Sequence, residues 1–115
     1  MYNKLSPYLN KKSDNVAKIL DHLLNLLGQI TGKKHKVEFK KNSLHIVDNK
    51  AFLGIHFLKD ILRINIVLKH SIQTSLPYKL DKPSKNVFHN YVDLQTPVDL
   101  NLVKKYIVEA YEVQR

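Results

Sequence analysis

The chain has 115 residues, of which 19 are Lys or Arg and 10 are Asp or Glu, so its formal net charge at pH 7 is +9. A hydrophobic fraction of 43% beside 25% charged residues is typical of a globular protein and argues against a disordered one, and the length suits one domain. The absence of cysteine excludes disulfides, thiolate nucleophiles and Cys-ligated metal centres.

The N-terminal segment, residues 1–12, carries no signal for export. It is rich in lysine and lacks the apolar core of a secretory signal, and no apolar run in the chain approaches the roughly 20 residues that cross a bilayer. We therefore expect a cytoplasmic protein without a membrane span. Because Pro7 opposes a continuous helix, residues 1–12 are expected to form a loosely ordered arm beside a single domain of residues 13–115.

A helix is predicted to begin near Ser13, a favourable N-cap, and to end near Gly32. Its apolar residues recur at spacings of three and four, which predicts one stripe facing the core. The stripe consists of Val16, Leu20, Leu23, Leu27 and Ile30.

From residue 36 onward, apolar and polar residues alternate with the period of two that is typical of strands. Alternating strands are expected over residues 36–40, 44–47, 62–69 and 87–94. Residues 51–58 are apolar on both faces apart from His56, which is typical of an interior strand. The short polar links between the first four of these five strands require an antiparallel meander. Residues 70–86 are polar and contain Pro77 and Pro83, so we expect a long loop there.

A second helix is predicted to follow, with Thr96 as N-cap, Pro97 at the first helical position and Asp99 closing a capping box. Its apolar stripe consists of Leu100, Val103, Ile107, Ala110 and Tyr111. Each helix has one apolar stripe, so both must cover the same face of the sheet. The predicted fold is α+β, an antiparallel sheet of about five strands with N-terminal and C-terminal helices packed on one face.

Three segments, NKAFLGIHF, LRINIVLKH and HNYVDLQTPVDLNLVKKYIVEAYE, resemble the bacterial family named domain of unknown function 5655, also labelled "predicted transport protein". The resemblance extends over residues 16–112. The matching positions are Phe52, His89, Asp99, Leu100, Ala110 and Tyr111. In that family the domain occurs alone or joined to others, nucleases among them. The resemblance therefore implies a role related to nucleic acid, or an accessory role.

The chain has six histidines, which are candidates for metal binding or acid–base chemistry, but no two of them have the spacing of a helical metal motif. His45, His89 and Arg63 are expected to share the sheet face opposite the helices, and His56 joins them if Phe57 points inward. This group could bind an anion, or a metal if a carboxylate such as Asp93 faces the same side. The alternative is that these are ordinary solvent-facing residues of the strands.

Catalysis has no positive support in the sequence. Ser71 and Ser75 do not sit in a strained nucleophile turn, and the three glycines form no phosphate-binding loop. We therefore predict no catalytic residue, no cofactor and no metal ligand, and the sequence favours a protein that is not an enzyme.

Basic residues are densest between Lys33 and Lys41, and more follow near the end of the fourth predicted strand. Such a surface can neutralise phosphates, whereas a simple solvated edge of the sheet is the alternative. The residues predicted to bind an anion or nucleic acid are Lys33, Lys34, Lys36, Lys40, Arg63, Lys69, His70 and His89.

The leading hypothesis is thus a non-catalytic binding module for an anionic partner, either nucleic acid or an acidic protein. A second hypothesis is a structural or self-associating protein, a homo-oligomer, because Val47, Val67 and Tyr91 are apolar residues on the exposed side of the sheet. A third is a small-molecule or metal site built on His45, His56 and His89.

Overall fold

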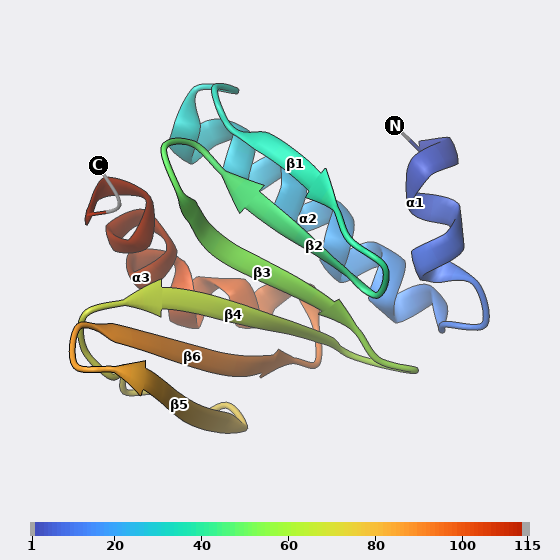
Figure 1. Ribbon diagram of the computed structural model, residues 1–115. Coiled ribbons are helices and arrows are strands. Elements are labelled where there is room, and N and C mark those ends of the chain that lie inside the picture. The colour runs from blue at the N-terminus through green and yellow to red at the C-terminus, as the bar shows by residue number, and fades with distance from the viewer. Residues whose placement is uncertain (1, 114–115) are drawn as a thin grey trace.

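The computed structural model describes residues 2–113, with side chains from residue 4 onward, and Figure 1 shows the order of its elements. The helices are α1 (Tyr2–Leu9), α2 (Asp14–Thr31) and α3 (Leu100–Val113), the last preceded by the short 3-10 helix η1 (Pro97–Asp99). The strands are β1 (Lys36–Phe39), β2 (Ser43–Val47), β3 (Ala51–Phe57), β4 (Leu62–Leu68), β5 (Tyr78–Ser84) and β6 (Val87–Leu94).

All six strands form one antiparallel sheet in the order β1-β2-β3-β4-β6-β5. The predicted α+β class and the meander of the first four strands are confirmed. The remaining two strands form a hairpin whose second strand, β6, pairs with β4, so that β5 lies at the edge.

The predicted loop over residues 70–86 is wrong in its second half, where β5 forms. Most side chains of this strand are exposed, so the sequence shows no apolar alternation there. Pro83 is tolerated because β5 is an edge strand, where a missing backbone donor need not break the ladder. The pairing with β6 shifts register between Asp81 and Ser84, close to this proline.

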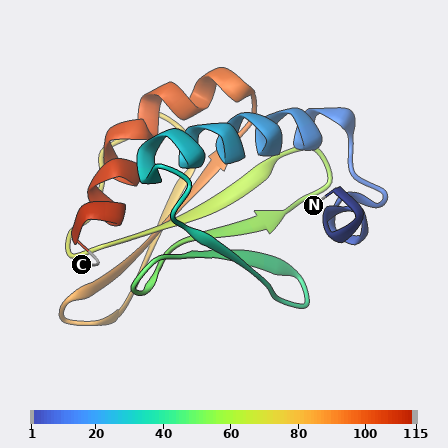
Figure 2. The ribbon, with the colours of Figure 1, turned by 90° about the horizontal axis from the view of Figure 1, so that it is seen from above.

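The long helices α2 and α3 lie side by side on one face of the sheet, as Figure 2 shows. Their apolar stripes are buried against the strands, as predicted, with Ile30 half-buried at the end of α2. Gly32 ends α2 in the left-handed conformation, with a φ of 63°. At the start of η1, the Asp99 carboxylate accepts hydrogen bonds from the backbone N–H groups of Gln95 and Thr96, at 2.9 and 3.1 Å.

The expectation of a loosely ordered N-terminal arm is wrong for residues 2–9, which form α1 despite Pro7. Contacts with the rest of the protein outweigh the lost backbone donor: Leu5 is buried in the core, and the ring of Tyr8 lies 5.2 Å from that of Phe57. The Tyr8 hydroxyl also donates a hydrogen bond to the carbonyl of Lys40, just beyond β1.

Candidate binding face of the sheet

One face of the sheet carries no helix (Figure 2). Strand residues alternate between the two faces, and the register fixes which ones share this side. We call this surface the open face. Its residues are Lys36, Glu38, Ser43, His45, Val47, Gly54, His56, Arg63, Asn65, Val67, Lys79, Asp81, His89, Tyr91 and Asp93.

Arg63 of β4 and Asp93 of β6 lie directly opposite each other and form a bidentate ion pair. Arg63 Nε donates to Asp93 Oδ1 at 2.6 Å, and a terminal guanidinium nitrogen donates to Oδ2 at 3.1 Å. This hydrogen bonding is the main cause that raises the pKa of Arg63. The ion pair links β4 to β6. Because Asp93 compensates the charge of Arg63, Arg63 adds little free positive charge to the open face.

Three rings form an aromatic cluster beside this pair: His56 from β3, with Tyr91 and His89 from β6. The centroids of His56 and Tyr91 are 6.0 Å apart with the planes tilted by 57°, and those of His89 and Tyr91 are 6.3 Å apart with the planes only 28° from parallel. His56 and Tyr91 reach toward each other across β4, which places Asn65 opposite Tyr91.

Gly54 leaves room for this arrangement. A Cβ at Gly54 would lie 3.6 Å from Nε2 of His56 and 3.4 Å from the Cβ of Asn65, so the imidazole of His56 rests over the glycine. A larger side chain at this position would occupy the space under the cluster, which gives the glycine a steric role.

Asn65 and His89 are joined by a 2.7 Å contact between Asn65 Nδ2 and His89 Nδ1. With the amide nitrogen assigned toward the ring, Asn65 Nδ2 donates and His89 Nδ1 accepts. Asn65 is buried, and its Oδ1 has no hydrogen-bond partner among the described residues. This hydrogen bond fixes the orientation of the His89 ring, which lies beside the ring of Tyr91.

Burial lowers the pKa of His56, and the positive charges of His45 and Arg63 lower it further. His56 is therefore neutral at pH 7 and presents an uncharged ring to the open face.

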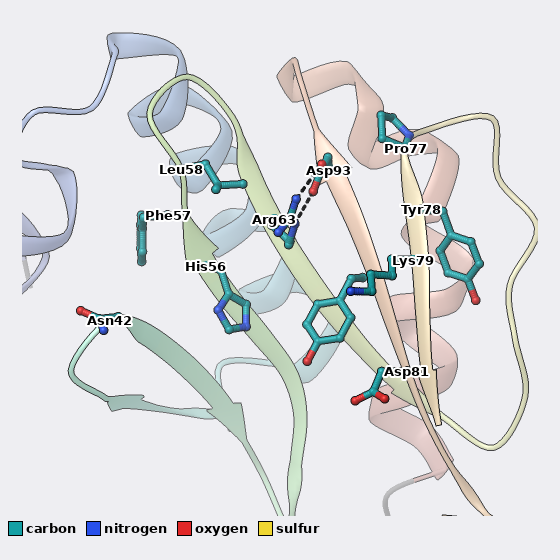
Figure 3. A pocket seen from close by; sticks show the side chains of 11 residues that line it. Asn42, His56, Phe57, Leu58, Arg63, Pro77, Tyr78, Lys79, Asp81 and Asp93 are labelled. Atoms are coloured by element: carbon teal, nitrogen blue, oxygen red, sulfur yellow. Dashed lines mark hydrogen bonds and ion pairs between the residues drawn. The ribbon is translucent and has the colours of Figure 1, made fainter. Parts of the chain in front are cut away.

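An open hollow of about 980 Å³ borders the cluster (Figure 3). His56 and Arg63 lie on one side of it, and Lys79 and Asp81 of β5 lie on the other. Tyr91 also lines the hollow, whereas His89 does not. The edge strand that the sequence did not reveal thus supplies one wall of the site.

The structure brings only part of the predicted anion-binding set together. Arg63 and His89 lie on the open face, with Lys36 and Lys40 near its β1 edge. Lys40 is paired with Glu38 at 3.3 Å, which reduces its free charge.

The other predicted residues lie elsewhere. Lys33 and Lys34 follow the end of α2, and Lys69 follows β4 beside a groove that Val113 of α3 also lines. His70 turns to the helices, where its Nε2 lies 2.5 Å from the Glu109 carboxylate. The basic residues of the prediction therefore do not form one cluster.

Sequence reasoning left Gly54 and Asn65 out of its prediction, whereas it placed Tyr91 on the exposed side of the sheet and Lys79 in a loop. Alternation of period two could place Asn65 and Tyr91 on the open face. It could not show that β6 pairs with β4, which is what sets Tyr91 opposite Asn65 and close to His56. Lys79 was hidden in the segment expected to be a loop.

Within residues 2–113, no three side chains of His, Asp or Glu gather as a metal would require, although Asp93 does face the same side as the histidines. No helix in the described part of the chain is long and apolar enough to span a membrane.

A family model described as "Domain of unknown function (DUF5655)" matches residues 5–114 of the chain. This match confirms the resemblance seen in the three sequence segments. No curated protein and no solved structure matches the chain.

Proposed function

Since the chain belongs to the family of the domain of unknown function DUF5655, we propose its role from its own surface: it is a non-catalytic binding module that holds an anionic partner, nucleic acid, on the open face. We place this interaction in the cytoplasm. The observation that carries the proposal is an uncovered sheet face with an aromatic cluster at its centre and lysines on both edge strands.

The charges of the open face set how such a partner would lie. Four cationic side chains, Lys36, Lys40, Arg63 and Lys79, stand against Glu38, Asp81 and Asp93. In the middle of the open face, the opposite charges of Arg63 and Asp93 cancel. The lysines lie toward the edge strands β1 and β5. Because neighbouring strands are about 4.8 Å apart, these two edges are separated by about 24 Å.

A nucleic acid strand laid across the sheet would therefore place phosphates near Lys36 and Lys79 and bases over the aromatic cluster. This combination of basic flanks and a stacking platform is how proteins hold single strands. The remaining positive charge of the molecule favours the approach of any polyanion through its long-range field.

Charge reversal at the two edges tests the proposal. We expect Lys36→Glu with Lys79→Glu to weaken binding of a dye-labelled single-stranded 12-mer by at least about tenfold, measured by fluorescence anisotropy at low salt. The matched control is Lys18→Glu with Lys104→Glu, which makes the same change in net charge on the exposed surfaces of α2 and α3.

Equal losses in the two double variants would show that only net charge matters, and the open face would then not be the binding surface. Absence of binding by the unmodified protein would overturn the proposal altogether, and tight binding of an acidic protein such as polyglutamate in its place would redirect it to an acidic partner.

A further inference from the structure

We propose that the hollow beside the aromatic cluster binds one unpaired base of a single-stranded nucleic acid. The base stacks on the ring of Tyr91, and His56 lies beside the edge of the base. This inference rests on the proposed function and specifies which part of the ligand enters the hollow. Phosphate neutralisation alone needs no such ring arrangement.

The electrostatic balance of the hollow favours a neutral group. Among its charged side chains, Arg63 is paired with Asp93, and Lys79 stands near Asp81 on the same strand. These four charges sum to zero, and His56 is neutral because its pKa is lowered. A phosphate has no unpaired cluster of cations to bind here, whereas a base is uncharged and carries donors and acceptors on its edges.

The geometry favours a flat group. His56 and Tyr91 line the hollow with their planes tilted by 57°, so they do not cover each other's faces. Tyr91 lines the hollow and His89 does not, although the two rings are close to parallel with centroids 6.3 Å apart. Asn65 holds His89 by a hydrogen bond, so His89 and Asn65 act on Tyr91 from outside the hollow as positioning residues.

The hollow is large enough to admit a base with its sugar, and its polar lining suits one. Its volume of about 980 Å³ lies at the upper end of the range for small-ligand sites. Asn42, Lys79 and Asp81 lie around it and supply amide, ammonium and carboxylate groups for hydrogen bonds to a base edge (Figure 3).

The test compares two single-stranded 12-mers of equal charge, one with bases and one abasic at every position. We expect the 12-mer with bases to bind the unmodified protein roughly tenfold more tightly, the order of one stacked base. Tyr91→Leu should remove most of this difference, and Tyr91→Phe, which keeps the ring, should retain it. Far-UV circular dichroism checks that both variants fold.

A second measurement does not depend on any variant. The chain contains no Trp, so the fluorescence of 2-aminopurine in a 12-mer can be read without a tryptophan background. Stacking on Tyr91 predicts that this emission changes when the unmodified protein binds and that it changes far less with Tyr91→Leu.

Equal, salt-sensitive binding of the abasic and base-containing strands would overturn base recognition while leaving the proposed anion-binding function intact. Failure of both strands to bind would overturn the function itself. Binding of adenosine monophosphate as tight as that of the 12-mer would overturn the nucleic acid strand as the ligand and assign the hollow to a free nucleotide.

Discussion

Asn90 and Asn65 are buried amides on the neighbouring strands β6 and β4, and they differ in how fully they are hydrogen-bonded. Asn90 Oδ1 accepts from the Tyr78 hydroxyl at 2.5 Å, and its Nδ2 donates to the carbonyls of Ile66 and His70 at 3.1 and 3.2 Å. It thereby joins β5, β4 and the segment that follows β4. Asn65 makes one such bond, to His89, and leaves its Oδ1 unpaired.

This contrast predicts different costs for the same substitution. Asn90→Leu leaves several buried polar groups without hydrogen-bond partners and should lower the free energy of unfolding by about 3 kcal/mol. Asn65→Leu should lower the free energy of unfolding by less than about 1 kcal/mol. Urea denaturation of both variants measures this, with Asn65→Leu as the matched control. A cost at Asn65 as large as that at Asn90 would contradict the account of the Asn90 network.

At the scale of elements, the segment after β4 is held to α3 by two side chains. His70 contacts Glu109, and the Tyr106 hydroxyl donates to the carbonyl of Gln73 at 3.3 Å. A backbone hydrogen bond to Ser71, followed by the bond to Glu109, raises the pKa of His70. Because the pKa is raised in the folded state, the stability that His70 contributes is present below the ordinary pKa of about 6.5 and is lost as pH rises through the folded pKa.

Glu109→Gln should therefore lower the pKa of His70, read from the NMR titration of its imidazole, but only in part because the bond to Ser71 remains. Asp21→Asn removes one charge from the exposed surface of α2 and serves as the control, with the His70 titration expected to stay unchanged. An unaltered His70 titration in Glu109→Gln would show that the Glu109 contact does not form in solution.

The elements that the sequence predicted are those whose side chains are divided between a buried and an exposed side. This applies to α2, α3, β1, β2, β4 and β6, whereas β3 was predicted from an apolar run typical of an interior strand. The capping box of Thr96 and Asp99 marked the start of the last helical segment. β5 was not predicted because most of its side chains are exposed and show no such alternation. α1 was not predicted because its stability depends on contacts with residues distant in sequence, such as Phe57. The site was only partly predictable for the same reason, since Tyr91 meets His56 through the β4–β6 pairing.

At the scale of the whole molecule, the net charge of +9 and the two lysines of the open face predict different salt dependences of nucleic acid binding. For a single strand, the slope of log K against log salt is about −0.7 per phosphate neutralised. Lys36 and Lys79 together predict a slope of about −1.4, because Arg63 and Lys40 are already compensated by Asp93 and Glu38.

Titration of the single-stranded 12-mer at several NaCl concentrations measures this slope. If the entire net charge acted without regard to location, the slope would approach about −6. A value near that limit would contradict binding confined to the open face.

The position of the β5–β6 hairpin in the sheet has a consequence for the order of folding. The meander β1 to β4 pairs strands that are adjacent in sequence, whereas β6 must close a long loop before it meets β4, a step that loop-closure entropy slows. The hollow has one wall on the meander and the other on the hairpin. The hollow is therefore completed at the last docking step, and a ligand bound in it would slow unfolding by holding the hairpin in place.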